Sequence, residues 1–288
     1  MFVFWNDRII PKSDACLSPD DRGFLFGDGV YEVVRAVNGR LFQAEPHWAR
    51  LRHGLAELRI AVAEEHLARL DHVATELLRR NGHDRGEATV YLQITRGAAY
   101  PRTHAFPKAT VAPTVYLTTT PFEPHRRWLD EGVAAVTAVD LRWRRCDIKS
   151  VNLLPNVLAK QMAVERGAYE AVLVREGYAV EGASSNVFVV RDGTLRTHPL
   201  GPDILAGITR ALVVELARYI GIPVEERPIP VDELVAADEV FLTGTTTDVM
   251  PVVRLDDRVI GDGRPGPLTR RLQQVYFDRL YAAPVAAA

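Results

Sequence analysis

Lys149 is the residue whose chemistry stands out in this sequence, near the end of the stretch RCDIKS at 145–150. Apolar segments lie on both sides of it, at 133–139 and at 151–154. A lysine held between buried segments loses water, which lowers its pKa and makes its amine nucleophilic toward carbonyls. Such an amine can form a Schiff base with an aldehyde. A lone lysine is more often a solvated surface residue, so this interpretation depends on the residues that accompany it.

Glu181 is the second residue with a chemical signature, because small residues and then an apolar strand follow it in the stretch EGASSNVF at 181–188. This pattern predicts a carboxylate at a tight, partly buried bend. A carboxylate that faces a pyridine nitrogen keeps the nitrogen protonated and strengthens the ring as an electron sink. The alternative is an acidic residue in an ordinary turn.

Two stretches and one arginine could together bind a phosphate. The stretch GITR at 207–210 is predicted to open a helix with Thr209 as its N-cap, and the backbone N–H groups of such a start bind anions. The stretch TGTTT at 243–247 follows a predicted strand and could add hydroxyls and amides, while Arg50 could add a charge. Each also has a plain interpretation, as a hydrated helix start, a turn or a solvated arginine.

Arg102 and His104 stand two residues apart in the loop predicted between 97 and 107. On an extended segment they point to the same side and could jointly bind a carboxylate. Tyr31, in the glycine-rich bend at 21–32, could complete this site with its hydroxyl. A loop arginine is more often solvated, and a tyrosine of this kind more often lies in the core. An imine-forming amine, a pyridine partner, a phosphate site and a carboxylate clamp are the parts that pyridoxal phosphate chemistry on an amino acid requires.

The elements that must position these residues fall into two groups along the chain. Residues 1–120 predict a small N-terminal α+β domain, in which Asn38-Gly39 is a hairpin signal between two strands. Residues 121–131, which begin with PFEP, are predicted to be an interdomain linker. Residues 132–288 predict a larger, β-rich, cofactor-binding domain whose last helix runs from Pro267 to Ala283. The predicted fold class is therefore a two-domain α+β or α/β protein.

The composition excludes several classes of function. A formal charge of −2 over 288 residues gives no electrostatic basis for binding nucleic acid or an anionic membrane. Cys16 and Cys146 are too few for a disulfide framework and lack metal-ligand spacing with histidine, so no metal site is expected. No apolar run approaches the length of a membrane span, and the first residues lack the pattern of a signal peptide. We therefore expect a cytoplasmic protein.

The sequence resembles the fold-type IV pyridoxal-phosphate aminotransferases over nearly its whole length, and within that family it looks like the bacterial D-amino acid transaminases. The resemblance covers the stretches described above and also Arg142-Trp143. The stretches around Lys149 and Glu181 are the specific ones, because a chance match to both in this order is improbable. Gly244 and Ala183 stand where members of the family often have serine.

The resemblance implies roles for individual residues toward the cofactor, pyridoxal 5'-phosphate. Lys149 would bond covalently to the aldehyde of the cofactor and would carry the proton that moves during the reaction. Glu181 would pair with the pyridine nitrogen, and Leu205 would pack beneath the ring. The phosphate would be held by Arg50, the backbone of Ile208 and Thr209, and Thr245.

The resemblance also implies the substrate and the assembly. Tyr31, Arg102 and His104 would bind the substrate carboxylate, with Arg102 and His104 reaching in from the partner subunit of a homodimer. The cofactor would lie between the two domains, near the subunit interface. The activity would be a ping-pong transfer of the amino group from a D-amino acid to a 2-oxo acid such as 2-oxoglutarate or pyruvate.

Three other functions fit the same residues. A transaminase of (R)-amines or branched-chain amino acids, and a lyase of the aminodeoxychorismate type, would share the fold and the lysine. Branched-chain aminotransferases and aminodeoxychorismate lyases are not expected to keep the pair Arg102 and His104, and a lyase would need no amino acceptor. The third is a phosphate-binding domain that works without the cofactor, which would be colourless when purified.

Overall fold

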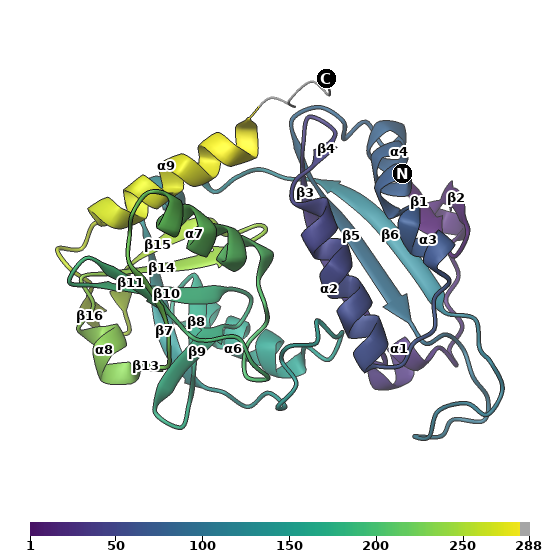
Figure 1. The fold of residues 1–288 in the computed structure, drawn as a ribbon. Helices are drawn as coiled ribbons and strands as arrows, with labels where there is room; N and C mark the ends of the chain where they lie inside the picture. Colours follow the sequence, from purple (N-terminus) through teal and green to yellow (C-terminus); the bar gives the residue numbers. More distant parts are fainter. Residues whose placement is uncertain (283–288) are drawn as a thin grey trace. The chain divides into compact units, whose positions relative to one another are not determined.

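The computed structural model describes residues 1–282 of the chain, which fold into two compact units (Figure 1). The first unit contains residues 1–123 and 148–152, and the second contains residues 124–147 and those from 153 onward. The segment 148–152 departs from the division expected from the sequence, which placed it in the C-terminal half. It joins the first unit because Ser150 forms an antiparallel bridge with Val30.

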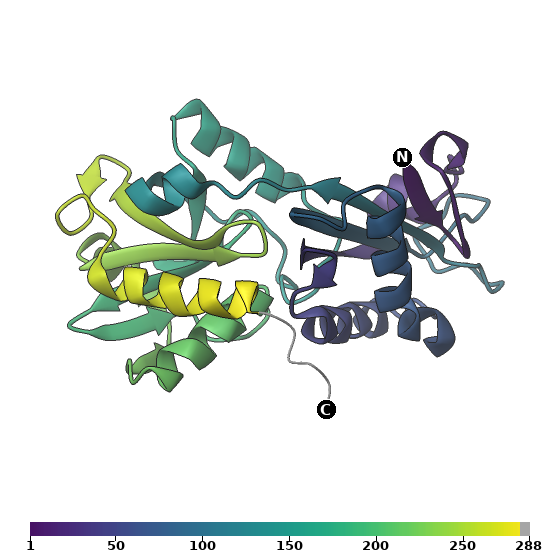
Figure 2. The same ribbon diagram turned by 90° about the horizontal axis from the view of Figure 1, so that it is seen from above.

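The first unit is built on a sheet with the strand order β2-β1-β6-β5-β3-β4, and helices α2 and α4 pack on one face of it (Figures 1 and 2). Its elements are β1 (Phe2–Trp5), β2 (Arg8–Pro11), the 3-10 helix η1 (Lys12–Asp14), α1 (Arg22–Phe26), β3 (Gly29–Val37), β4 (Arg40–Leu41), α2 (Ala44–Glu57), α3 (Glu64–Ala68), α4 (Leu70–Arg80), β5 (Glu87–Thr95) and β6 (Thr114–Pro121).

Strand β3 is central to this unit. Side chains on one of its faces pack in the core, and its first residues carry part of the candidate site. The hairpin predicted at Asn38-Gly39 is confirmed, since both residues have the positive φ angles, 48° and 76°, that a tight two-residue turn requires. Val30 lies in the same core as the apolar residues of α2. Gly54 permits this close packing, because a Cβ at that position would lie 3.0 Å from a methyl group of Val30.

The second unit contains the remaining helices and strands of the described chain. They are α5 (Arg126–Glu131), β7 (Val133–Val139), α6 (Leu154–Glu165), β8 (Glu170–Arg175), β9 (Tyr178–Gly182), β10 (Asn186–Arg191), β11 (Thr194–Thr197), α7 (Ile208–Tyr219), β12 (Val224–Glu226), β13 (Ile229–Pro230), α8 (Val231–Val235), β14 (Glu239–Gly244), β15 (Asp248–Leu255), β16 (Arg258–Val259) and α9 (Pro267–Tyr281). The last predicted helix was expected to reach Ala283, which lies outside the described residues.

The sheet of the second unit has the order β12-β11-β10-β14-β15-β7-β8-β9-β13, with β16 paired to β15. Helices α7 and α9 pack beside each other against β14 (Figures 1 and 2). The register between β10 and β14 sets Asn186 opposite Thr243, and Glu181 lies near the end of β9. Ends of three strands therefore carry the polar side chains of this unit that matter for function.

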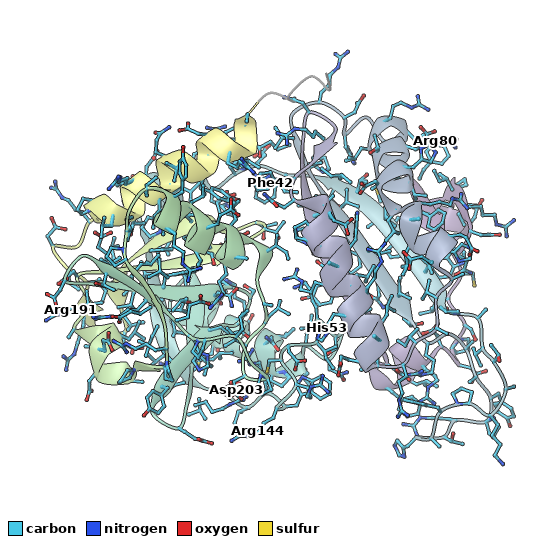
Figure 3. The ribbon with its side chains drawn as sticks, in the orientation of Figure 1. Phe42, His53, Arg80, Arg144, Arg191 and Asp203 are labelled. Carbon is cyan, nitrogen blue, oxygen red and sulfur yellow. The ribbon has the colours of Figure 1, made fainter. Side chains whose placement is uncertain are left out.

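The predicted mixture of helices and strands is confirmed in both units. Charged side chains such as those of Arg80 and Arg191 point into solvent (Figure 3), while the apolar side chains fill the cores. No helix within residues 1–282 combines the length and the apolar composition needed to cross a membrane.

Candidate active site

Lys149 lies in the first unit, on the segment that pairs with the beginning of β3. The backbone N–H of Tyr31 donates to the carbonyl of Lys149 at 3.0 Å, and that of Val151 donates to Gly29 at 3.1 Å. The Lys149 Nζ donates to the Tyr31 hydroxyl at 3.4 Å and lies 4.4 Å from the centroid of the Tyr31 ring. The structure thus brings together the predicted amine and the predicted phenol, which lie 118 residues apart in the sequence.

A buried carboxylate on β3, Glu32, holds the side chain of Arg50. Glu32 Oε1 accepts from Arg50 Nε at 2.7 Å, and Oε2 accepts from Arg50 Nη2 at 2.8 Å and lies 2.8 Å from His47 Nδ1. Burial disfavours the charged form of Glu32, but Arg50 and His47 outweigh this effect and lower its pKa to about 2. Sequence reasoning missed Glu32, although a charged residue on the same face of a strand as Val30 and Val34 was a usable signal.

Arg102 and His104 lie on the exposed loop between β5 and β6, in the same unit. The guanidinium carbon of Arg102 is 4.3 Å from the centroid of the Phe26 ring, and the ring of His104 is 5.5 Å from it. Within residues 1–282, neither side chain forms an ion pair, and neither forms a hydrogen bond or ring contact with Tyr31 or Lys149. The structure therefore brings the two loop residues together, apart from the other residues of the predicted clamp.

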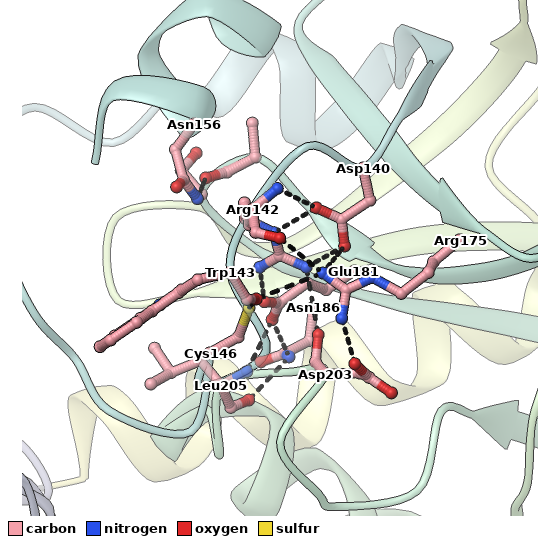
Figure 4. Close-up of polar contacts among 12 residues, drawn as sticks. Asp140, Arg142, Trp143, Cys146, Asn156, Arg175, Glu181, Asn186, Asp203 and Leu205 are labelled. Atoms are coloured by element: carbon pink, nitrogen blue, oxygen red, sulfur yellow. Dashed lines mark hydrogen bonds and ion pairs between the residues drawn. The ribbon is translucent and has the colours of Figure 1, made fainter. Parts of the chain in front are cut away.

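Glu181 lies in the second unit, and its side chain is enclosed by polar partners (Figure 4). Oε1 accepts a hydrogen bond from Arg142 Nη1, while Oε2 accepts from Asn186 Nδ2 and from the Leu205 N–H, both at 3.0 Å. Burial raises the pKa of Glu181 to about 7, although the charge and the hydrogen bond of Arg142 oppose this rise. Near neutral pH this carboxyl group can therefore both hold and release a proton.

Arg142 is itself held by a network of buried charges (Figure 4). Asp140 Oδ1 accepts from Arg142 Nε at 2.9 Å, and Asp140 Oδ2 lies 2.8 Å from a guanidinium nitrogen of Arg175. Arg175 also forms an ion pair with Asp203, whose carbonyl accepts from Arg142 Nη2 at 3.1 Å. The guanidinium that faces Glu181 is therefore fixed in position by groups from three separate parts of the chain.

Asn186 connects the residues of this unit that the sequence selected separately. Its Nδ2 donates both to Glu181 and to the carbonyl of Leu205, at 3.0 Å each. Its Oδ1 lies so close to Gly207 that a Cβ there would be 2.0 Å away. The structure thus brings Glu181, Leu205 and the start of α7 together around one amide, which the sequence analysis did not select.

Ile208 and Thr209 open α7, but Thr209 is not the N-cap that was predicted. The N-cap is Gly207, with φ −65° and ψ 133°, and in the described chain no side chain caps this helix start. Glycine stands there because the amide of Asn186 occupies the space that a larger N-cap residue would need. The backbone N–H groups of the first turn, which helices leave without intrahelical partners, remain suited to an anion.

Thr245 follows β14 in a partly buried position, two residues beyond Thr243. The hydroxyl of Thr243 is buried and has no hydrogen-bond partner within residues 1–282. Buried polar groups are rarely left unsatisfied in a working protein. An unpaired hydroxyl, an uncapped helix start and a buried carboxyl group with a raised pKa are together the partners that a phosphorylated pyridine would satisfy, so these residues fit the expected cofactor.

Comparison with known proteins assigns the family. A family model described as amino-transferase class IV matches residues 29–255. The chain belongs to this family. It is 45% identical to the D-alanine aminotransferase of Bacillus licheniformis over 273 residues, which are 95% of each chain. It is 41% identical to the D-alanine aminotransferase of Staphylococcus epidermidis over 272 residues, which are 94% of this chain and 95% of the relative.

Solved structures of aminotransferases match this class IV aminotransferase along its whole fold. The branched-chain amino acid aminotransferase of Escherichia coli superimposes with a TM-score of 0.87 at 27% identity, covering 96% of this chain and 93% of the other. The branched-chain aminotransferase of the archaeon Thermoproteus uzoniensis, solved with norvaline, gives a TM-score of 0.83 at 29% identity, covering 96% of this chain and 94% of the other. The predicted fold-type IV architecture is therefore confirmed.

The two units of this class IV aminotransferase offer chemically different groups. The first unit supplies an amine beside a phenol, at Lys149 and Tyr31, and the guanidinium of Arg50. The second unit supplies the carboxyl group of Glu181, whose pKa lies near neutrality, and the helix start at Gly207, which no side chain of the described residues caps. An amine that can bond to an aldehyde and a carboxyl group that can face a pyridine nitrogen are the chemical requirements of amino-group transfer.

Proposed function

We propose that this class IV aminotransferase transfers the amino group of a D-amino acid to a 2-oxo acid, such as 2-oxoglutarate or pyruvate, with pyridoxal 5'-phosphate as its cofactor. The observation that carries the proposal is its identity of 45% and 40%, over 95% and 94% of the chain, to proteins named D-alanine aminotransferase. When it is bound, the cofactor supplies an electron sink for the bonds at the substrate Cα.

Lys149 carries out the proton transfer of the reaction. Its Nζ would bond covalently to the cofactor aldehyde and, as a free amine, would carry the proton that leaves the substrate Cα. The hydroxyl of Tyr31, 3.4 Å from Nζ, orients the amine for both tasks. The hydrogen bonds between the lysine segment and β3 support this role, because they fix the backbone from which the Lys149 side chain extends to Tyr31.

Cofactor binding is assigned to residues of both units. Glu181 would pair with the protonated pyridine nitrogen, whose positive charge would favour the ionised carboxylate that burial otherwise disfavours. Leu205 would pack beneath the ring, and its N–H donates to the Glu181 carboxylate at 3.0 Å. The phosphate would be bound by Arg50, the backbone N–H groups of Ile208 and Thr209, and Thr245.

The substrate carboxylate is bound by Tyr31, Arg102 and His104, the last two acting on substrate held by the other subunit of a homodimer. Their exposure, and the lack of an ion pair at either loop residue within the described chain, support this role. A homodimer is also supported by exposed apolar side chains on α6, where Leu158 is 60% and Leu154 is 69% exposed.

The proposal extends to the organisation and location of the chain. The two compact units act as a small N-terminal and a larger cofactor-binding domain. The chain first passes between them at residues 123–124, within the segment 121–131 that was expected to be a linker and whose later part forms α5. A cytoplasmic location is supported by the two cysteines, Cys16 and Cys146, which are both free thiols.

A spectrophotometric titration of the purified holoenzyme tests the substrate. Addition of D-alanine should convert the cofactor absorbance to that of the aminated form, and pyruvate should restore it, while L-alanine should leave the spectrum unchanged. Branched-chain aminotransferase activity is the second candidate, because solved structures with this name share the fold. A faster conversion by L-leucine than by D-alanine would replace the proposal with this second function.

The lysine is tested with a matched pair of variants. Lys149→Ala should fold, as judged by its circular dichroism spectrum, but should lose turnover. Lys160→Ala is the control, because Lys160 Nζ also lies 4.4 Å from the centroid of a tyrosine ring, that of Tyr169, yet it has no proposed role. Substantial transamination by Lys149→Ala would remove Lys149 from its role.

A further inference from the structure

The loop that carries Arg102 and His104 is attached to the rest of the first unit through its backbone carbonyls. Arg22 Nη1 donates to the carbonyl of Thr103 at 2.7 Å and of Ala105 at 3.4 Å, while Nη2 donates to that of His104 at 3.3 Å. One guanidinium group therefore contacts three consecutive carbonyls, 81 to 83 residues away in the sequence. One of these carbonyls belongs to His104 itself, and the other two belong to its neighbours in the chain, of which Thr103 also adjoins Arg102.

Arg22 is in turn held by Asp28, which lies outside the loop. Arg22 Nε donates to Asp28 Oδ2 at 2.8 Å, and Arg96 binds the same carboxylate at 2.7 and 2.9 Å. The side chain of Arg22 is only 5% exposed. Its backbone is held by the cap of α1, in which the side chain of Asp21 accepts from the N–H of Gly23 at 2.8 Å.

The ring of Phe26 provides a second attachment for the same loop. The guanidinium carbons of Arg22 and Arg102 lie 4.7 and 4.3 Å from its centroid, and the ring of His104 is 5.5 Å away. An arginine over an aromatic face keeps its in-plane N–H groups directed outward, where they can bind a carboxylate. Helix α1 therefore holds both the backbone of the loop, through Arg22, and the side chains of Arg102 and His104, through Phe26.

We propose that Arg22 is a positioning residue for the substrate-carboxylate clamp: through three carbonyls it sets the orientation of Arg102 and His104. This inference rests on the proposed function, in which these two residues bind the substrate carboxylate. Arg22 does not touch the substrate. It determines whether the side chains of Arg102 and His104 reach the carboxylate together, which a loop lacking regular secondary structure does not secure by itself.

The test is steady-state kinetics of the holoenzyme with D-alanine and pyruvate. Arg22→Lys keeps a positive charge beside Asp28 but cannot reach three carbonyls, so KM for both substrates should rise by about tenfold or more while kcat stays within about twofold. The absorbance of the bound cofactor should not change. Arg35→Lys is the matched control, since Arg35 is a buried, ion-paired arginine of the same unit whose partner is Glu87, and its KM values should stay at the wild-type level.

A double-mutant comparison with Arg102→Ala separates the inference from the function on which it rests. If Arg22 acts through Arg102, adding Arg22→Lys to Arg102→Ala should raise KM little further. An unchanged KM in Arg102→Ala alone would overturn the clamp and this inference with it. A normal KM in Arg22→Lys, or a full additional rise in the double variant, would overturn the inference and leave the clamp standing. Phe26→Leu replaces Arg22→Lys if that variant does not fold, and should raise KM in the same way.

Discussion

The buried carboxyl group of Glu181 should make the stability of the cofactor-free protein depend on pH in a direction opposite to that of an ordinary ion-paired carboxylate. Its side chain is 6% exposed and lies against Arg142, yet burial raises its pKa to about 7 from the ordinary value of 4.5. The proton is therefore held more tightly in the folded chain than in the unfolded one. The perturbation is Glu181→Gln, which removes the titration and keeps the shape of the side chain.

The magnitude follows from the two pKa values. A tenfold difference in proton affinity is worth about 1.4 kcal/mol, so the difference between 4.5 and about 7 corresponds to about 3 kcal/mol in the free energy of unfolding. This stabilisation is fully present below pH 4.5, is lost as the pH rises to about 7, and changes no further above that value. The substituted amide directs an NH₂ group or an oxygen toward Arg142, which adds a constant difference at every pH.

The assay is urea unfolding of the cofactor-free wild type and of Glu181→Gln between pH 4 and pH 8. The free energy of unfolding of the wild type minus that of the variant should fall by about 3 kcal/mol as the pH rises across this range. Groups that titrate alike in both proteins cancel in this difference. Glu165→Gln, on the exposed side of α6, shows the effect of removing a carboxylate in water. A difference that is constant with pH, or that grows as the pH rises, would refute the argument from burial.

Two further substitutions test the other buried contacts of the site. Glu32→Gln should lower the free energy of unfolding at pH 7 by about 3 to 5 kcal/mol in urea, because it removes a fully buried carboxylate that pairs with the 9% exposed guanidinium of Arg50; a loss below about 1 kcal/mol would contradict this. Gly207→Ala should weaken binding of pyridoxal 5'-phosphate at least about tenfold in an absorbance titration, because its Cβ would lie 2.0 Å from Asn186 Oδ1 and must displace that amide. Gly201→Ala, where the added Cβ meets nothing within 4 Å, is the control and should bind normally.

Local patterns in the sequence were sufficient for the elements that carry the site. The turn at Asn38-Gly39 predicts β3 and its partner, because two residues with positive φ admit few alternatives. The stretch GITR at 207–210 predicts that a helix begins there, and α7 does begin at Ile208. The predicted N-cap, Thr209, lies two residues after the actual one, Gly207. A larger side chain at 207 is excluded by the amide of Asn186, which belongs to β10 and is therefore not part of the local pattern.

Contacts between strands were beyond the sequence for a related reason. Asn186 reaches Glu181 only because the chain turns back between β9 and β10, and it faces Thr243 only through the register with β14. The same holds for the buried pair of Glu32 and Arg50, which joins a strand to a helix. Residue types suggest that such groups have partners, but the choice among many arginines and carboxylates is made by the register of the sheets.

Contacts from a side chain to distant backbone leave even less trace in a sequence. The stretch at 21–32 attracted attention for its glycines and aromatic residues, while the hydrogen-bond donors of Arg22 go to carbonyls at 103–105. Every residue has a backbone carbonyl, so the residue types at 103–105 do not indicate that these carbonyls accept hydrogen bonds from Arg22. A substitution in that loop that keeps Arg102 and His104 but changes the path of the backbone should therefore weaken substrate binding as strongly as Arg22→Lys. Kinetics of a variant with one glycine inserted after His104, compared with one inserted after His83 in the turn that follows α4, measure this directly, because only the first insertion interrupts the run of three carbonyls that Arg22 binds.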